Sequence, residues 1–306
     1  MGFIDEIKNF YTNSNIVIRL IAINVAVFLV VHVFNVIFFL FNIESVGGFT
    51  LVGVLSVPAD LLSLVFRIWT PVTYMFLHEG FFHILFNMLW LFWLGTLFYQ
   101  FIGERQLLTV YLLGGLSGAF LFVLSYNIFP AFSNVKDQAL ALGASASVMA
   151  IIIATCVYRP NFAINLLFFG PVKLKYIGIV SVILDLMMIP NSNAGGHIAH
   201  LGGAFFGLYY IMQLKKRNDL SGGFQKFLEK FAHFFKKKSA SRMKVSYKKD
   251  NFAQGSRRPT SDYDYNKQKF DTQKEIDQIL DKISKSGYDS LSKQEKELLF
   301  KQSDKK

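Results

Sequence analysis

Cysteine is almost absent from this sequence, because Cys156 is the only one in 306 residues. A single thiol excludes an internal disulfide framework, a CxxC redox motif and a cysteine-rich zinc site. Charged residues are also scarce, at 17%, whereas hydrophobic residues reach 52% and the mean hydropathy is +0.35. This composition is typical of an integral membrane protein and argues against two soluble domains.

The basic excess is confined to the C-terminal part of the chain. Residues 1–214 carry eight Lys and Arg against eight Asp and Glu, so that residues 215–306 hold the other 24 basic and 13 acidic residues of the totals of 32 and 21. The net charge of +11 is therefore not the distributed basic surface of a nucleic-acid-binding protein. We expect no nucleic-acid partner.

Six apolar runs are long enough, or nearly so, to cross a bilayer core of about 30 Å, which needs roughly 20 helical residues. They cover approximately residues 16–41, 82–102, 107–129, 139–157, 174–189 and 196–214. The fourth and fifth runs are short, and the fifth contains Asp185. The sequence thus predicts an all-α integral membrane protein with a six-helix bundle over residues 16–214, after a short N-terminal segment, residues 1–15.

Basic residues in the short connections predict the orientation, because cytoplasmic loops are enriched in Lys and Arg. Such residues lie between the fourth and fifth runs and directly after the sixth: Arg159, Lys173, Lys175, Lys215, Lys216 and Arg217. We expect both termini in the cytoplasm and the protein in the plasma membrane of a bacterium. The segment from Glu44 to Glu79 then lies outside, either as a plain loop or anchored in the interface by Trp69 and Tyr74.

A basic amphipathic helix is expected after the sixth run, over residues 215–238. Twelve Lys and Arg against two acidic residues lie between Lys215 and Lys249. An apolar stripe at spacings of three and four is formed by Phe224, Phe227, Leu228, Phe231 and Phe235. This pattern predicts that residues 215–249 bind anionic lipids at the membrane surface, with a solvated charged tail as the alternative.

The remaining residues divide into a linker and a small helical unit. Residues 239–270 are polar and are predicted to be a disordered linker. Residues 271–306 are expected to form a helical hairpin, in which Ser292 and Glu295 make a capping box. Because this hairpin is small, we expect it to dock on an unknown cytoplasmic partner.

Four polar residues lie near the start of alternate predicted spans, where each costs free energy in hydrocarbon. His83 and Asn87 belong to the second span, Ser145 to the fourth and His200 to the sixth. Because these spans cross the membrane in the same direction, the four residues lie at nearly the same depth. The spacing of four between His83 and Asn87 places both on one helix face, and we expect all four side chains to converge.

Together these side chains can carry out acyl transfer. Ser145 is the candidate nucleophile and His200 the candidate base that removes its proton. His83, Asn87 and the backbone amide of Ser145 are candidate donors to an oxyanion. We expect no carboxylate in the set, because another buried anion would add a desolvation cost. The sequence therefore predicts a Ser–His dyad that needs no cofactor and no metal.

Glycine supports a close approach of the fourth and sixth spans. Gly143 lets the chain bend closely into the fourth span, next to Ser145. Gly203 and Gly207 form a small-xxx-small face one turn beyond His200, a pattern that lets two membrane helices pack with their backbones in contact.

Taken together, these motifs resemble the rhomboid family of intramembrane serine proteases. The stretch WTPVTYMFLHEGFFHILFN, from Trp69 to Asn87, looks like the first loop and second helix of that family. GASA, at 143–146, is similar to its GxSG motif, and AHLGGAFFG, at 199–207, resembles its sixth-helix motif. The resemblance covers about residues 16–214. It implies a serine endopeptidase that uses Ser145 and His200 to cleave transmembrane protein substrates in or near their membrane-spanning segments.

Three positions depart from the family pattern. Ala146 stands in place of the second glycine of GxSG, and Thr70 in place of an arginine that often follows Trp69. Met149 replaces an aromatic residue that often stacks on the base. None of these changes removes the dyad, and Arg67 is a candidate for the anchoring role of the missing arginine.

Other functions fit the sequence less well. A catalytically inactive rhomboid-like adaptor that binds transmembrane helices has no need of an intact Ser145 and His200. A transporter favours paired charges near the midplane and an inverted repeat, and the sequence has neither. A metal site could use four histidines, namely His78, His83, His197 and His200. However, the sequence has no HExxH motif, and a metal site would leave the serine motif unexplained.

Overall fold

The computed structural model describes residues 2, 5, 6, 9, 12–41, 50–166, 170–191, 193–235 and 262–303. The described residues are mostly helical and belong to two compact units, residues 1–239 and 240–306. The helical class predicted from the sequence is confirmed.

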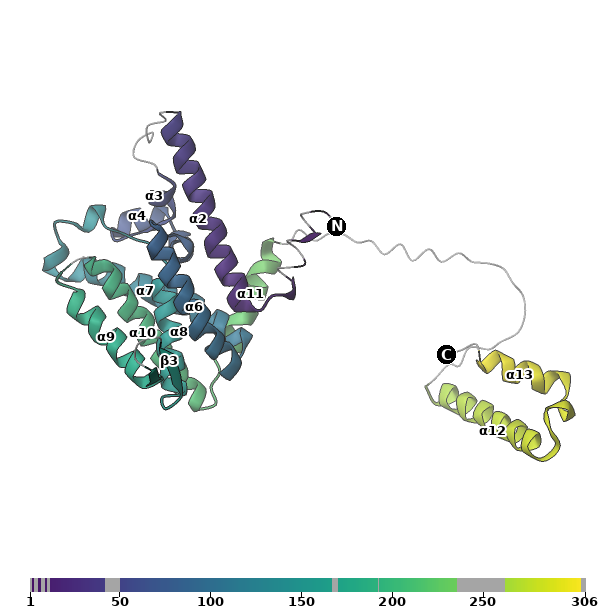
Figure 1. The fold of residues 1–306 in the computed structure, drawn as a ribbon. Coiled ribbons are helices and arrows are strands. Elements are labelled where there is room, and N and C mark those ends of the chain that lie inside the picture. Colours follow the sequence, from purple (N-terminus) through teal and green to yellow (C-terminus); the bar gives the residue numbers. More distant parts are fainter. Residues whose placement is uncertain are drawn as a thin grey trace. The chain divides into compact units, whose positions relative to one another are not determined.

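In the first unit, one helix corresponds to each of the six predicted apolar runs (Figure 1). These helices are α2 (Ile16–Leu40), α6 (Phe81–Phe101), α7 (Glu104–Ile128), α8 (Ser145–Tyr158), α9 (Leu174–Met188) and α10 (Ala194–Lys215). Among the described residues, α2, α6 and α7 are both long and apolar enough to cross a membrane, and α8 is a shorter apolar helix.

The fourth predicted run is only partly helical. Leu140–Ala141 forms strand β2, which pairs antiparallel with β1 (Val57–Pro58) so that Val57 lies opposite Ala141. The chain then turns at Gly143, whose φ of +126° is a conformation that residues with a Cβ rarely adopt. Ser145 is therefore the first residue of α8 and not a residue inside a longer helix.

Short elements connect α2 to α6: α3 (Leu51–Leu55), α4 (Leu61–Phe66), α5 (Thr70–Thr73) and η2 (Tyr74–Phe76). Arg67 Nη1 donates to the Gly53 carbonyl at 2.9 Å and so links the end of α4 to α3, whereas its substitution for the family's arginine stays a prediction. Tyr74 is not an interfacial anchor, because its side chain is buried and its hydroxyl donates to the Gly115 carbonyl at 2.6 Å.

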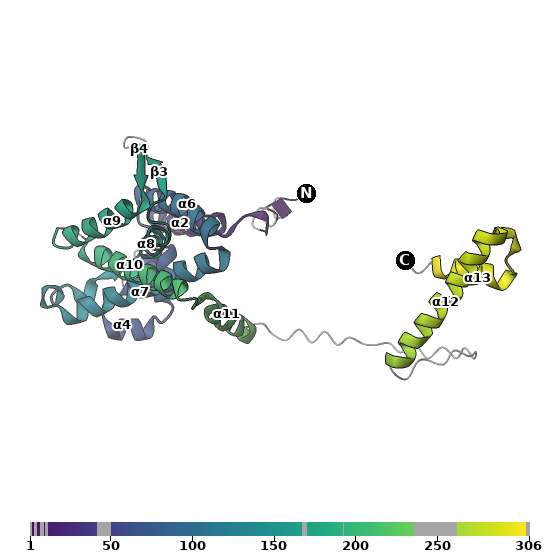
Figure 2. The same cartoon turned by 90° about the horizontal axis from the view of Figure 1, so that it is seen from below.

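The centre of the unit is formed by α7, α8 and α10, which all pack against one another (Figures 1 and 2). Glycines make this possible. A Cβ at Gly203 would overlap the Ala146 carbonyl oxygen, and one at Gly207 would overlap that of Ala150. The predicted close contact between the fourth and sixth helices is confirmed, because side chains at these positions would force the backbones apart.

Two loops complete the bundle. The α7–α8 connection contains η3 (Pro130–Phe132) and η4 (Lys136–Gln138). Between α8 and α9, strands β3 (Ala163–Leu166) and β4 (Gly170–Lys173) pair antiparallel, with Ala163 opposite Lys173. Figure 2 shows this hairpin projecting from the bundle beside α9.

The basic helix is α11 (Ser221–Phe235), and Asp219 fastens its start to the bundle. Asp219 accepts hydrogen bonds from Tyr210 Oη at 2.9 Å, from Gln106 Nε2 at 3.0 Å and from the Ser221 amide at 2.9 Å. Burial by itself raises the pKa of Asp219, but the hydrogen bonds lower it by more than burial raises it. The pKa of Asp219 therefore lies below its usual value. The side chains of Phe231 and Phe235 lie outside the described residues.

The second unit contains α12 (Asp262–Ser286), η5 (Tyr288–Ser290) and α13 (Lys293–Ser303). The predicted capping box is present: the Ser292 amide donates to Glu295 Oε2 at 2.7 Å, and the Glu295 amide donates to Ser292 Oγ at 3.3 Å. Helix α12 begins within the segment predicted to be a linker, whose residues 239–261 lie outside the described ones.

Candidate active site

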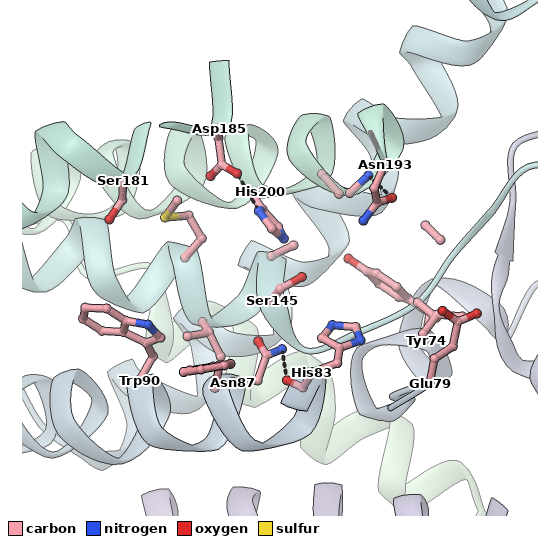
Figure 3. A pocket seen from close by; sticks show the side chains of 18 of the residues that line it. Tyr74, Glu79, His83, Asn87, Trp90, Ser145, Ser181, Asp185, Asn193 and His200 are labelled. Carbon is pink, nitrogen blue, oxygen red and sulfur yellow. Dashed lines mark hydrogen bonds and ion pairs between the residues drawn. The ribbon is translucent and has the colours of Figure 1, made fainter. Parts of the chain in front are cut away.

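A cavity of about 820 Å³ lies among α6, α8, α9 and α10 (Figure 3). His83 and Asn87 from α6, Ser145 from α8 and His200 from α10 all line it. Each of these residues lies within the first two turns of its helix. The four side chains that the sequence predicts to converge therefore share one cavity.

The loop before α8 is held in place by hydrogen bonds to the segment before α6. The Gly143 amide donates to the Tyr74 carbonyl at 2.9 Å, and the Ala144 amide donates to His78 Nε2 at 3.5 Å. Burial lowers the pKa of His78 to about 4, so this imidazole is neutral at physiological pH. Its Nε2 can therefore accept the hydrogen bond from the Ala144 amide. His78 thus holds the loop that presents Ser145.

His83 and Asn87 lie beside Ser145 on the α6 side. A Cβ at Gly143 would be 2.9 Å from His83 Nε2 and 3.5 Å from Ser145 Oγ, so both groups approach the same point. Asn87 Nδ2 donates one hydrogen to the His83 carbonyl at 2.9 Å, which leaves its second hydrogen for the cavity. The Ser145 amide is in the first turn of α8, where N–H groups have no partner within the helix.

His200 is hydrogen-bonded to a carboxylate that is not among the predicted site residues. Asp185 Oδ1 accepts from His200 Nδ1 at 2.8 Å (Figure 3) and from His197 Nδ1, also at 2.8 Å. The expectation that no carboxylate accompanies the set is wrong, because two imidazole N–H groups offset the desolvation cost of this anion. The sequence already indicated a role for Asp185, because it is the only acidic residue of the fifth run. An ionisable residue within a span marks a functional site by default.

The hydrogen bonds of Asp185 orient His200 toward Ser145. Figure 3 shows the His200 ring between Asp185 and Ser145. Because Nδ1 donates to Asp185, Nε2 is the nitrogen left to face the cavity. Within the described part of the chain, Ser145 Oγ forms no hydrogen bond, so Ser145 and His200 line the same cavity without a hydrogen bond between them.

The departures from the family pattern are accommodated by their neighbours. The Ala146 methyl faces Gly118 of α7, where a Cβ would lie only 2.5 Å away, so the missing side chain at Gly118 leaves room for the extra methyl. Thr70 is buried and donates to the Arg67 carbonyl at 2.8 Å. Met149 lines the cavity on α8.

The four histidines do not form one cluster. The rings of His78 and His83 pack edge to face at 5.0 Å, whereas His197 and His200 both bind Asp185. Among the described residues, the group of three metal-ligating side chains that lies together is Asp185, His197 and His200.

The Rhomboid domain model matches residues 65–217, which is half of the chain. The chain belongs to the rhomboid family. The matched region includes α6 to α10 and every residue of the candidate site, so the resemblance read from the three sequence motifs is confirmed. A second model, a family of unknown function (DUF6576), matches residues 259–305, which include α12 and α13.

Curated relatives within the rhomboid family include proteins of plants and animals. RHOMBOID-like protein 12, mitochondrial, of Arabidopsis thaliana is 35% identical over 149 residues, 45% of this chain and 44% of the relative. Presenilin-associated rhomboid-like protein A, mitochondrial, of Danio rerio is 29% identical over 139 residues, 44% of this chain and 35% of the relative. Presenilin-associated rhomboid-like protein, mitochondrial, of Homo sapiens is 28% identical over 139 residues, which again cover 44% of this chain and 35% of the relative. The alignments span less than half of each relative.

The predicted location is contradicted by these comparisons. The sequence predicts the plasma membrane of a bacterium, whereas the relatives are named as mitochondrial proteins. The charge distribution on which the expectation rested separates the two sides of a membrane but does not say which membrane it is.

Proposed function

We propose that this rhomboid protein is an intramembrane serine endopeptidase that hydrolyses peptide bonds in or near the membrane-spanning segments of other proteins. The observation that carries the proposal is the cavity shared by Ser145, at the start of α8, and His200, whose other nitrogen is held by Asp185. A serine, an imidazole and a carboxylate in this order are the parts that activate a serine nucleophile.

In the proposed reaction Ser145 Oγ attacks the substrate carbonyl carbon while His200 Nε2 takes the hydroxyl proton. The imidazolium formed is stabilised by Asp185, which accepts its Nδ1–H. The proton then passes to the leaving amine as the peptide bond breaks. Water attacks the acyl-enzyme with His200 again as base, which releases the acid and restores Ser145.

The tetrahedral intermediates carry a negative oxygen, for which the cavity offers three donors. These are the free hydrogen of Asn87 Nδ2, the ring N–H of His83 and the backbone amide of Ser145. All three lie within the first two turns of α6 or α8, so they are positioned before substrate binds. We assign His83 and Asn87 this stabilising role.

The membrane arrangement that we propose has six spans, formed by α2 and α6 to α10. Helix α8 has 14 residues and is thus only about 21 Å long, less than a bilayer core. Its N-terminus would lie within the membrane, where the loop through Gly143 and the cavity bring water to Ser145. The names of the relatives support a mitochondrial membrane as the location.

Two further partners remain proposals from the sequence pattern. The Phe224–Phe227 pair and the exposed Lys226 and Lys230 of α11 support binding to an anionic lipid surface. For the α12–α13 unit we propose a protein partner on the same side of the membrane as Lys215, because the unit is small and has its own family model.

The test is covalent labelling with a serine-directed fluorophosphonate, together with cleavage of a model transmembrane substrate by the full chain in detergent. We expect Ser145→Ala and His200→Ala each to abolish cleavage, and the double variant to be no worse than either single one, because the two residues act as a unit. Ser181→Ala is a matched control: Ser181 lines the same cavity, but its hydroxyl donates to the Ile177 carbonyl at 2.9 Å. Additive partial losses would contradict the proposal.

The second candidate function is a rhomboid-like adaptor that binds transmembrane helices without cleaving them. Two observations favour it: Ser145 Oγ has no hydrogen bond to His200 in the described part of the chain, and the names of the relatives state a likeness to rhomboid and no activity. An adaptor would resist the fluorophosphonate, and Ser145→Ala would bind the model substrate as the unchanged chain does.

A further inference from the structure

The cluster of Asp185, His197 and His200 has a geometry that the catalytic reaction does not use fully. The reaction needs one hydrogen bond to Asp185, from His200, yet the Nδ1 atom of His197 converges on the same carboxylate oxygen at the same 2.8 Å. The three ligand atoms lie within 4.8 Å of one another. Two imidazole nitrogens and one carboxylate oxygen grouped this closely have the composition of a metal-binding set.

We propose that these three side chains bind a Zn²⁺ ion that inhibits the enzyme reversibly. Two histidines and one carboxylate are a common Zn²⁺ ligand set, with water in the fourth position. At ligand distances of about 2.0–2.1 Å, a tetrahedral site separates its ligand atoms by roughly 3.3 Å. To admit the ion, the two N···O separations of 2.8 Å must open by about 0.5 Å and the two nitrogens, which lie within 4.8 Å of each other, must reach a similar spacing, which rotations of the three side chains can provide.

An ion can reach the cluster through the cavity. The side chains of His197 and His200 are 21% and 24% exposed, and Asp185 and His200 line the cavity wall. His197 and His200 are three residues apart near the start of α10, and Asp185 faces them from α9. The site thus bridges two helices, and an ion there would hold α9 against α10.

Inhibition follows from the tautomer that the ion imposes. In the hydrogen-bonded state Nδ1 of His200 carries the proton and Nε2 has a free lone pair for the Ser145 proton. A metal ion takes the Nδ1 lone pair, so the single proton of the neutral ring moves to Nε2. Nε2–H can no longer accept from Ser145. The imidazole ring carries one proton both in the hydrogen-bonded and in the metal-bound state, so binding of the ion needs no net proton release from the ring.

This inference rests on the proposed function for its inhibitory part, but the site can be tested without activity. The experiment is calorimetric titration of the purified full chain in detergent with ZnCl₂, paired with fluorophosphonate labelling at each Zn²⁺ concentration. We expect one Zn²⁺ per chain and loss of Ser145 labelling with the same midpoint, both reversed by EDTA.

His197→Gln distinguishes a metal site from a hydrogen-bond network. The glutamine amide can still donate to Asp185 but does not replace an imidazole ligand. We expect Zn²⁺ affinity and Zn²⁺ inhibition to weaken together by at least about tenfold. His32→Gln is the control, because the His32 ring in α2 bonds to the Phe28 carbonyl and belongs to another helix. Asp185→Asn is a second variant with the same expected loss of Zn²⁺ affinity.

The outcomes are separable. Equal Zn²⁺ affinity in the unchanged chain and in both His197→Gln and Asp185→Asn would overturn the site. Stoichiometric Zn²⁺ binding with undiminished labelling would overturn the inhibition. Zn²⁺ binding that depends on His197, in a chain whose Ser145 is never labelled, would support the metal site and contradict the proposed protease function.

Discussion

At the scale of single residues, the orientation of His200 depends on Asp185. An isolated imidazole can carry its proton on either nitrogen, and only the tautomer with a free Nε2 can act as base toward Ser145. The 2.8 Å bond from Nδ1 to Asp185 selects that tautomer. Asp185 is therefore a positioning residue, since it acts through His200 and does not touch the substrate in the proposed reaction.

We expect Asp185→Asn to lower kcat by roughly 100- to 10,000-fold with little change in KM, because an amide can donate to Nδ1 and stabilise the wrong tautomer. The measurement is steady-state cleavage of a model substrate in EDTA, which removes any effect of bound metal. Asp137→Asn, an exposed substitution in η4, serves as the control. A rise in KM at constant kcat would mean that Asp185 shapes substrate binding and not the base.

At the scale of helices, the arrangement of Ser145 and His200 depends on how closely α10 packs on α8. The backbone of α10 at Gly203 meets the Ala146 carbonyl, one residue after the nucleophile. The same helix carries His200 one turn earlier. The distance between nucleophile and base is therefore set by a contact between backbones, and a side chain at this contact would increase it.

Gly203→Leu should abolish the labelling of Ser145 without preventing membrane insertion, because the added atoms push α10 from α8 at a cost of about 1–3 kcal/mol. Fluorophosphonate labelling of membrane-extracted protein measures the effect. Gly222→Leu is the matched control, since a Cβ at Gly222 in α11 has no neighbour within 4 Å. Full labelling of Gly203→Leu would show that another contact assembles the site.

Helix α11 provides a separate prediction about the membrane surface. A peptide of residues 220–238 should bind vesicles that contain anionic lipid, and this binding should weaken strongly as salt rises, because surface potentials decay within about 10 Å at 0.1 M salt. Because residues 220–238 contain no tryptophan, the peptide carries a fluorescent label, and its binding to the vesicles is measured by fluorescence titration. The same peptide with Lys226→Gln and Lys230→Gln should bind more weakly; equal binding at all salt concentrations would contradict an electrostatic attachment.

At the scale of the whole molecule, the chain divides after residue 239, well beyond the last predicted span. The boundary matters because α11 belongs to the first unit. Asp219 links the start of α11 to Gln106 of α7 and Tyr210 of α10. Since the pKa of Asp219 is lowered in the fold, the attachment is present above the unfolded pKa and is lost as pH falls through the folded value.

Deletion of residues 240–306 should leave Ser145 labelling and thermal stability in detergent unchanged, because that unit is compact by itself. Deletion of residues 218–306 should lower the thermal midpoint, since it removes Asp219 and leaves Tyr210 without its acceptor. A thermal scan of both truncated chains beside the full chain measures the difference. Loss of labelling in the shorter deletion would mean that the α12–α13 unit takes part in catalysis.

The sequence by itself determined the helical membrane class, the positions of the helices to within a few residues for five of the six runs, and the residues that meet in the cavity. It did so because apolar runs and polar residues inside them are local properties of the chain. Tertiary structure decided that α8 begins at Ser145, that Tyr74 is buried, and that Asp185 binds His200. These depend on which surfaces of α7, α9 and α10 come together, and a carboxylate finds its partners only when two helices that are separated along the chain are packed side by side.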